Sequence, residues 1–308
     1  MSASAPKSTT DTDPDLQLTE EERELLSIRT VPEFEAAQAA RRRAKALAKA
    51  PESHLATVRR ARKINRILGE TYPYAVAELD FTNAFELLIA TVLSAQTTDV
   101  RVNQVTPALF ARYPDAPALA AAIEEEVEPY IQSLGFYRAK AKSIVKLARQ
   151  LTDDYDGEVP GTLDKLVKLA GVGRKTANVV LGNAFGVPGL TVDTHFGRLA
   201  RRMGFTTEDD PVKVEHDVAE LIEPREWTDF SHRMVYHGRR ICHARKPACG
   251  VCPIADLCPS WGEGETNETK ARKLMKYEMA PGRERLHLRF LTGATRRQLH
   301  AEGYPLSA

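Results

Sequence analysis

The 308-residue sequence has few cysteines, few aromatic side chains and no long hydrophobic run. Its four cysteines all lie within residues 242–258, whereas disulfide-rich secreted domains spread theirs along a short chain. The longest apolar stretch, residues 85–95, is too short to span a bilayer, and no apolar segment near the N-terminus suggests a secretory signal. We therefore expect a cytoplasmic protein without a membrane partner, associated with the nucleoid if bacterial, whose clustered cysteines bind a metal.

The chain also has little net charge, since 43 basic residues offset 42 acidic ones to leave +1. Taken alone, this argues against a nucleic-acid partner. The charge is unevenly distributed, however. Residues 1–40 hold three basic and nine acidic side chains, a net of −6, so residues 41–308 carry +7. Residues 270–297 alone hold nine basic and two acidic side chains. Most of the chain is therefore moderately basic and suited to a polyanionic partner.

Both ends of the sequence differ from its centre. Residues 1–53 are predicted to be a disordered or partly helical tail, because they are polar, acidic at first and poor in aromatics. Within the tail, the basic stretch 41–50 is either a solvated linker or an arm that contacts phosphates. Residues 263–308 are predicted to form a basic extension, either an added surface element or a DNA contact. The extension contains the chain's single plausible strand, residues 286–291.

Between these ends, residues 54–260 have a helical pattern throughout. Apolar residues recur at spacings of three and four, and alternating strands joined by hairpin turns are absent. The sequence therefore predicts an all-α fold. The stretches that we expect to be helical are 56–72, 85–95, 100–113, 117–134, 138–155, 163–170, 174–185 and the segment that follows Asp193.

A glycine turn, Gly171-Val172-Gly173, separates two of these helices. The two glycines allow backbone conformations that other residues avoid, and Val172 can pack down between the helices. Backbone N–H groups of the turn then lie beside a helix N-terminus, an arrangement that binds phosphate without reading a base. A Gly-x-Gly sequence alone is weak evidence, but here both flanking helices agree with it.

Two charged residues near this turn are candidates for chemistry. Lys175 is either a solvated or phosphate-binding lysine or an amine nucleophile, since a helix N-terminus disfavours the protonated amine and partial burial would lower its pKa further. Asp193 precedes a helical pattern and is either an N-cap or a catalytic carboxylate; the two roles are compatible, because capping fixes the carboxylate. His195, taken alone, is better explained as structural.

The cysteines are spaced Cys242-x6-Cys249-x2-Cys252-x5-Cys258. Four thiolates can bind Zn²⁺ or a [4Fe–4S] cluster. Structural zinc usually uses two CxxC pairs, and the longer, uneven spacing here favours the cluster. Basic residues that surround the cysteines offer phosphate contacts: Arg239, Arg240, Arg245 and Lys246.

The hairpin GVGRKTA, the cysteine spacing and the segments LSAQTTD and GFYRAKA together resemble the endonuclease III family of helix–hairpin–helix DNA glycosylase/AP lyases. The resemblance covers residues 54–260. One departure is Ala170, where the family usually has proline. The resemblance implies a two-lobed fold, with a six-helix barrel over residues 77–187 and a lobe formed by 54–76 and 188–262. It also implies that Cys242, Cys249, Cys252 and Cys258 bind a [4Fe–4S] cluster in the second lobe.

The same resemblance assigns roles to residues. It makes Lys175 the nucleophile and Asp193 the second catalytic residue, which face each other in the cleft between the lobes. Gln96 would fill the gap in the DNA stack, and Phe136 would act as a second wedge, although a core position for this aromatic is equally reasonable. The residues expected to contact DNA are Gln96, Phe136, Gly171, Val172, Gly173, Arg174, Thr176 and His195.

These features predict a monomeric, bifunctional base-excision repair enzyme. It would bind duplex DNA that contains a damaged base or an abasic site, remove oxidised pyrimidines through a lysine Schiff base and cut the strand by β-elimination. Three alternatives remain: a monofunctional mismatch or damage glycosylase, which typically lacks the lysine; a non-catalytic DNA-binding module; and an iron–sulfur electron carrier with incidental DNA affinity.

Overall fold

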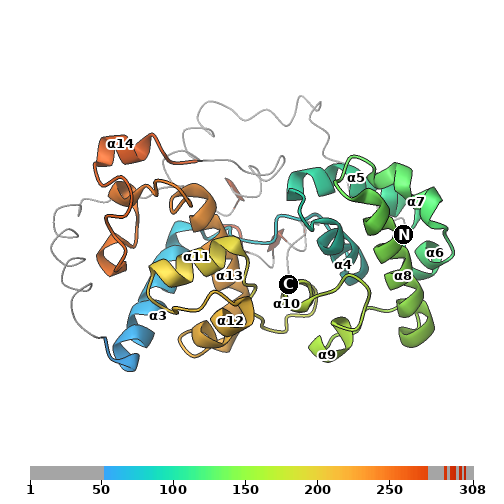
Figure 1. Cartoon of the computed structure of the whole chain (residues 1–308), viewed down its shortest axis with the longest axis horizontal. Coiled ribbons are helices and arrows are strands. Elements are labelled where there is room, and N and C mark those ends of the chain that lie inside the picture. The colour runs from blue at the N-terminus through green and yellow to red at the C-terminus, as the bar shows by residue number, and fades with distance from the viewer. Residues whose placement is uncertain (1–51, 277–287, 290–291, 296–297, 300–301, 303–308) are drawn as a thin grey trace.

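The computed structural model describes residues 52–276, 288–289, 292–295, 298–299 and 302, and every regular element within them is a helix (Figure 1). This confirms the predicted all-α class. The predicted tail lies outside the described residues except for its last two positions. The α-helices are α3 (His54–Thr71), α4 (Ala84–Leu93), α5 (Asp99–Arg112), α6 (Ala116–Ala120), α7 (Glu124–Ile131), α8 (Tyr137–Tyr155), α9 (Leu163–Leu166), α10 (Arg174–Ala184), α11 (Thr194–Arg202), α12 (Pro211–Ala219), α13 (Trp227–Arg240) and α14 (Glu268–Arg272). Short 3₁₀ turns are η2 (Pro224–Glu226), η3 (Cys249–Val251) and η4 (Ala255–Leu257).

Polar side chains fix where several of these helices begin. In each case an oxygen of the residue before the first helical turn accepts a hydrogen bond from a backbone N–H of that turn, which satisfies a donor that the helix itself cannot pair. The capping residues are Ser53, Asn83, Thr98, Asp115, Asp193, Asp210 and Asn267.

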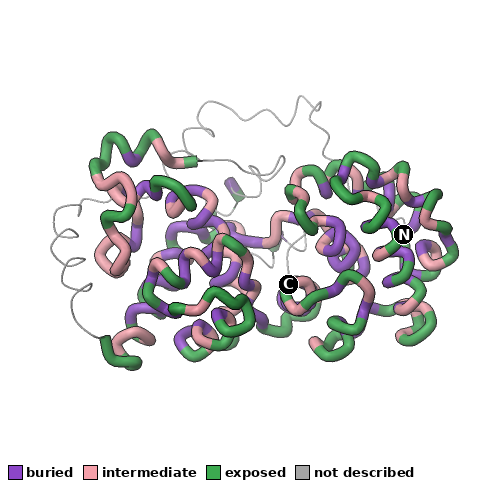
Figure 2. Tube along the Cα trace, viewed as in Figure 1, coloured by how far each residue is buried: buried purple, intermediate pink, exposed green. Residues whose placement is uncertain are grey.

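The helices bury two large, separate apolar cores (Figures 1 and 2). The first core is formed by α4 to α10 and includes Leu88 of α4, Ile144 of α8 and Val180 of α10, all fully buried. The second is formed by α3 and α11 to α13 and includes Ile64 and Phe230. Burial of apolar side chains stabilises each group of helices, so the described helices form two lobes.

The chain crosses between the lobes twice, and polar contacts bind the second crossing. After α10 completes the first core, the Asn178 side-chain amide donates a 2.8 Å hydrogen bond to the carbonyl of Leu190. The next N–H, that of Thr191, donates to Ser231 Oγ on α13 at 2.9 Å. These bonds secure the segment that leads into α11. The start of α11 is therefore held against both lobes.

Three sequence expectations about elements need correction. The stretch 117–134 forms two helices, α6 and α7, because the chain turns at residues 121–123. The stretch 163–170 forms only one α-helical turn, α9, before tighter turns begin. Within the predicted strand 286–291, the two described residues are helical, and the carbonyl of Leu288 accepts a hydrogen bond from the Thr292 N–H at 2.8 Å, which is helical spacing.

No helix in the described part of the chain is both long and apolar enough to cross a membrane.

Candidate active site and cysteine cluster

The turn that precedes α10 has the plugged geometry expected from its sequence. Gly171 has φ +75°, and a Cβ there would lie 3.2 Å from Val92 Cγ1, so both conformation and space favour glycine. Val172 is 6% exposed and belongs to the first core. Gly173, however, has φ −91° and ψ 174°, an extended conformation open to any residue. The prediction that Gly173 adopts a backbone conformation that other residues avoid is therefore wrong. The absence of a side chain at Gly173 instead leaves the helix N-terminus uncovered.

Ala170, which departs from the family's usual proline, makes a contact that proline cannot make. Its backbone N–H donates a 2.7 Å hydrogen bond to Gln150 Oε1 on α8. The amide nitrogen of Gln150 donates in turn to the carbonyl of Lys168 at 3.3 Å. One side chain thus secures the hairpin on both sides of Leu169. This bonding replaces the rigidity that a proline ring would supply.

Lys175 lies in the first turn of α10, with its side chain exposed. The capping position, Gly173, offers no side-chain hydrogen bond, so N–H groups of this turn remain available to an anion. Within the described residues, no ion pair or hydrogen bond engages the Lys175 amine. The partial burial considered from the sequence is absent, and the amine is free to reach a bound substrate.

The residues on either side of Lys175 differ in their surroundings. Arg174 makes a bidentate pair with Glu215 of α12, with both N–O distances at 2.8 Å, and its pKa is raised chiefly by this hydrogen bonding. The pair joins α10 of one lobe to α12 of the other. A role for Arg174 in DNA binding stays a prediction, since the structure already gives its guanidinium a partner. Thr176 is half-buried.

Asp193 is the N-cap of α11, where its Oδ1 accepts a 2.7 Å hydrogen bond from the Phe196 N–H. The N-cap interpretation is therefore confirmed. Asp193 lies two residues after Thr191 of the tethered segment, and Asn178, which holds that segment, lies three residues after Lys175 on α10. Among the described residues, no ion pair joins Lys175 to Asp193. The predicted catalytic roles of these two residues stay predictions.

His195 is half-buried beside Asp193, and burial is the largest cause that lowers its pKa, while the Asp193 charge opposes the shift. Its Nδ1 lies 3.2 Å from Nη2 of Arg198. The same Nη2 donates to the carbonyls of Gly238 at 3.1 Å and Cys242 at 2.9 Å. Arg198 therefore connects the first turn of α11 to the first cysteine, a link that its sequence context did not indicate.

The two predicted wedge residues lie on loop tips. Gln96 is exposed with φ 54°, and Phe136 is 71% exposed with φ 58°. Left-handed backbone is uncommon for residues with a side chain, especially a bulky one. An exposed phenylalanine in this conformation contradicts the alternative that Phe136 is a core aromatic. Both side chains are available to a bound duplex, although insertion into DNA stays a prediction.

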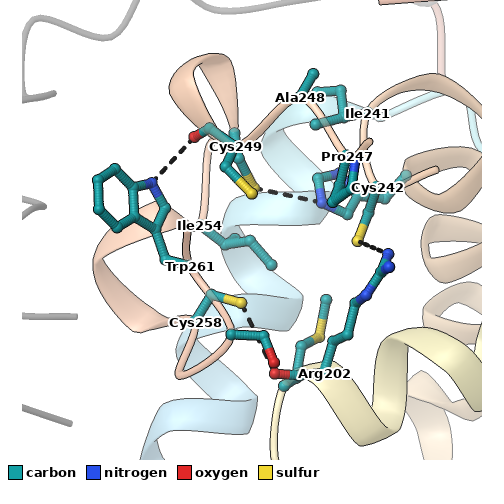
Figure 3. Close-up of a pocket in the computed structure, with 13 residues that line it drawn as sticks. Arg202, Ile241, Cys242, Pro247, Ala248, Cys249, Ile254, Cys258 and Trp261 are labelled. Atoms are coloured by element: carbon teal, nitrogen blue, oxygen red, sulfur yellow. Dashed lines mark hydrogen bonds between the residues drawn. The ribbon is translucent and has the colours of Figure 1, made fainter. Parts of the chain in front are cut away.

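The four cysteines line one cavity, beside Arg202 at the end of α11 and His237 of α13 (Figure 3). Arg202 Nη1 donates to Cys242 Sγ at 3.4 Å, and His237 Nε2 lies 3.5 Å from Cys252 Sγ. The Trp261 indole N–H donates to the Cys249 carbonyl at 3.1 Å. Apolar side chains complete the lining, among them Met203, Ile241 and Ile254.

This cavity fits a cluster better than it fits a single ion. Among the described residues, no three His, Cys, Asp or Glu side chains approach closely enough to hold one metal ion. Burial raises the pKa of Cys242 and of Cys252, and raises that of Cys258 to about 12. Four inward-facing thiols, set apart around an apolar space with a cation nearby, suit a larger group that binds them as thiolates.

The basic residues around the cysteines are not all available to DNA. Arg240 is buried, with its guanidinium 4.2 Å from the ring centroid of Tyr236. Arg239 pairs with Glu78 and, at 3.3 Å, with Asp99. The expectation that these two arginines meet phosphates is therefore not supported by their surroundings. Arg245 and Lys246 are exposed, as a phosphate contact requires.

One buried cation was missed from the sequence. Lys140 is only 6% exposed, and its Nζ donates a 2.6 Å hydrogen bond to Thr97 Oγ1, next to Gln96. Burial lowers its pKa. The available signal was its position on α8, four residues before Ile144 and seven before Leu147, on the helix's buried stripe.

Comparison with known proteins agrees with this geometry. Residues 89–224 match the model of the HhH-GPD superfamily of base excision DNA repair proteins, and residues 242–258 match that of the iron-sulfur binding domain of endonuclease III. The endonuclease III of Synechocystis sp. is 52% identical over 202 residues, which cover 65% of this chain and 92% of that protein. The Escherichia coli K12 endonuclease III is 45% identical over 194 residues, which cover 62% and 90%.

Solved structures extend the likeness to three dimensions. A non-covalent endonuclease III–DNA complex and a trapped endonuclease III–DNA covalent intermediate each align with a TM-score of 0.63 at 44% identity, covering 70% of this chain and 98% of that one. A thermostable thymine-DNA glycosylase, 24% identical with a TM-score of 0.61, shares the fold. The sequence relationships thus agree with the two lobes, the plugged hairpin and the four-cysteine cavity. This chain belongs to the endonuclease III family.

Proposed function

We propose that Lys175 is the nucleophile of a bifunctional DNA glycosylase/AP lyase that acts on duplex DNA in base-excision repair. The exposed amine in the first turn of α10, whose N-terminus no side chain caps, carries this assignment. The hairpin binds the DNA backbone without reading sequence, and so places the lysine near the sugar of an extruded nucleotide.

The reaction proceeds in two stages. Nζ of Lys175 attacks C1′ and gives up a proton to Asp193, while the C1′–N bond breaks and the base leaves with the bonding electron pair and gains a proton. The sugar ring of the resulting lysine N-glycoside then opens at the C1′–O4′ bond, O4′ gains a proton, and the nitrogen lone pair forms the Schiff base. The Schiff base acidifies the C2′ proton, whose removal expels the 3′ phosphate oxygen and cuts the strand. Hydrolysis of the Schiff base finally restores the free lysine.

Asp193 supplies a fixed negative charge for this reaction. Its Oδ1 is occupied by the cap bond to Phe196, which leaves the other carboxylate oxygen to stabilise positive charge that develops on the sugar or to accept a proton. The tether from Asn178 to Leu190 supports its placement opposite α10. A carboxylate held by a helix cap does not have to reorganise during the reaction.

The chain binds a [4Fe–4S] cluster, and we assign its ligands as Cys242, Cys249, Cys252 and Cys258. The cluster orders the loop that carries exposed Arg245 and Lys246, which we assign as phosphate contacts. Because all four cysteines serve as ligands, no open coordination site is implied, and we assign the cluster a structural role.

The remaining assignments concern the substrate. Gln96 and Phe136 enter the duplex from their exposed loop tips, Gly171 to Thr176 bind its backbone, and His195 lies near the extruded nucleotide. Extrusion costs least at a damaged pair, which supports oxidised pyrimidines as the substrate class. The site of action is the cytoplasmic DNA. Lys175 argues against a monofunctional glycosylase, which would need only an activated water.

The test is strand cleavage of a duplex that contains a single thymine glycol. Wild-type protein should release the base and cut the strand, whereas Lys175→Ala should lose both activities. Lys168→Ala, at another exposed lysine of the hairpin region, is the matched control and should cleave normally. The assignment is overturned if Lys175→Ala retains the cleavage rate of the control while its cluster absorbance is intact.

A further inference from the structure

Two loops that carry the proposed wedge residues are joined by a buried lysine. Lys140 lies in the first turn of α8, directly after Phe136, and its backbone N–H donates to the Phe136 carbonyl at 3.0 Å. Its side chain reaches the other loop, where Nζ donates to Thr97 Oγ1 at 2.6 Å. Thr97 is the immediate neighbour of Gln96. One residue therefore contacts both loops within a residue or a turn of the two exposed tips.

The cost of burying a charge makes the Lys140 side chain dependent on its contact with Thr97. Lys140 is 6% exposed as a residue, and burial of a charged side chain is costly unless partners replace the water that it loses. Among the described residues, Thr97 is its one side-chain partner. A lysine retained on the buried stripe of α8 thus depends on the position of the Thr97 hydroxyl, and the loop at residues 94–98 is held at a fixed distance from α8.

We propose that Lys140 is a positioning residue that sets the spacing between the loops of Gln96 and Phe136, so that both side chains enter the duplex as one unit. The inference rests on the proposed function, because it assumes that the two tips insert into DNA. Lys140 itself need not touch substrate. Loss of its bond to Thr97 would free the two loops to move independently. The entropy lost on ordering them would then oppose DNA binding.

Two substitutions and a matched control test the bond. Lys140→Met removes the charge at similar length, and Thr97→Val removes the acceptor at similar volume. Lys142→Met, at an exposed lysine on the same helix, is the control. The fluorescence of 2-aminopurine opposite a thymine glycol reports the opening of the DNA stack. Binding of undamaged duplex and thermal unfolding are measured in parallel.

We expect Lys140→Met and Thr97→Val each to weaken damaged-duplex binding about tenfold, with a reduced 2-aminopurine signal and little change on undamaged duplex. That loss corresponds to about 1.4 kcal/mol. The double variant should be no worse than either single one, because both remove one interaction. Thr97→Ser, which keeps the hydroxyl, should retain the damaged-duplex binding and the 2-aminopurine signal of wild type.

The outcomes separate this inference from the proposed function. If Gln96→Ala and Phe136→Ala leave the fluorescence unchanged, the wedge assignment itself is wrong. If those two variants reduce the signal but Thr97→Val does not, or if the Lys140 and Thr97 effects simply add, the coupling is wrong. If Thr97→Val and Lys140→Met lower only the unfolding temperature, Lys140 is merely structural and the inference fails.

A second inference rests on the segment after the last cysteine, beyond the matched iron-sulfur domain. The Glu265 N–H donates to the Pro247 carbonyl, and the Gly250 N–H donates to the Glu265 carbonyl, both at 2.9 Å. The backbones pass so closely that a Cβ at Gly264 would overlap the Pro247 carbonyl oxygen. Further along, the carbonyl of Leu274 lies 2.8 Å from His243 Nε2.

The segment also has an apolar contact with the cysteine loop. Fully buried Ala271 of α14 packs with Ile241, Ala248 and Val251, and Leu274, Met275 and Cys252 lie against this group. We infer that residues 264–276 form a lid over the cluster loop that slows loss of the cluster. The lid is held by backbone pairing at one end and by Leu274 at the other.

Release of iron measures the lid directly. Leu274→Ala should speed the decay of visible cluster absorbance in excess chelator several-fold, whereas Lys273→Ala, at the exposed neighbour, should match wild type. Circular dichroism before chelation checks that the variants are folded. Equal decay rates for folded Leu274→Ala and wild type would overturn the inference. If Leu274→Ala does not fold, Leu274→Met takes its place. Its cluster should decay at the wild-type rate if packing protects the cluster, and a faster decay would contradict the inference.

Discussion

At the scale of single residues, Asp193 combines a structural and a proposed catalytic role. Its cap bond to Phe196 stabilises the start of α11. In the proposed mechanism its charge also serves the reaction. Asparagine caps helices about as well as aspartate but carries no charge. The two roles are therefore separable by substitution.

Asp193→Asn should keep the free energy of unfolding near that of wild type while base excision falls by at least about tenfold, which is about 1.4 kcal/mol of transition-state stabilisation. Asp193→Ala should lose both activity and about 1 kcal/mol of stability through the missing cap. Single-turnover excision and urea unfolding measure the two effects. Full activity in Asp193→Asn would show that the charge has no part in the reaction.

His195 gives a pH dependence whose sign follows from burial. Its pKa in the folded state lies below the ordinary 6.5, because burial outweighs the opposing charge of Asp193, and Arg198 and Arg239 add to the lowering. Between the folded pKa and about 6.5 the unfolded chain binds more protons than the folded one. The contribution of His195 to the free energy of unfolding therefore decreases as pH falls through this window. Above about 6.5 its contribution is fully present.

His195→Gln should therefore reduce the loss of unfolding free energy between pH 7.5 and pH 5.5 relative to wild type. Urea unfolding at the two pH values gives the difference. His216→Gln, at an exposed histidine on α12, is the control, and the effect of His195→Gln should exceed its effect. A larger acid loss in His195→Gln than in wild type would contradict the sign.

At the scale of elements, the hairpin depends on a contact between helices. Gln150 of α8 accepts from the Ala170 N–H and donates to the Lys168 carbonyl. Gln150→Leu keeps the size of the side chain but leaves these backbone groups to water. We expect a loss of about 1 kcal/mol of stability and weaker DNA binding, because the hairpin is less ordered before it binds.

Urea unfolding and binding to an abasic-site analogue check this expectation. Gln132→Leu, at an exposed glutamine just after α7, provides the comparison. Unchanged affinity in Gln150→Leu would show that the hairpin is ordered without this contact.

Much of the helical pattern was predictable from the sequence, and the reasons for the exceptions are physical. Spacing of apolar residues located α4, α8 and α10, because each buries one stripe or its whole surface. The division of residues 117–134 into α6 and α7 was missed, since apolar residues continue through the break. Leu288 and Arg289 read as part of a strand because a short alternating stretch also fits a helical turn.

The site was less predictable than the helices. The motif alone drew attention to Lys175, Val172 and the cysteines. Long-range partners have no local signal, so the pairing of Arg174 with Glu215 and the link from Arg198 to the Cys242 carbonyl emerged only from the fold.

At the scale of the whole molecule, the two proposed catalytic residues belong to different lobes. Lys175 lies in the first turn of α10, which packs in the first core, and Asp193 caps α11, which packs in the second. Bonds across the junction hold these elements together: Arg174 to Glu215, and Asn178 to the Leu190 carbonyl. The proposed reaction therefore requires the docking of both lobes rather than either alone.

In the proposed mechanism, Lys175 forms the covalent link to the sugar. Borohydride trapping on a thymine-glycol duplex, followed by proteolysis and mass spectrometry of the adduct, tests this link most directly. We expect one reduced lysine–sugar adduct, at Lys175, and none in Lys175→Ala. An adduct mapped to another amine in the wild-type protein, or base release without any trapped adduct, would contradict it.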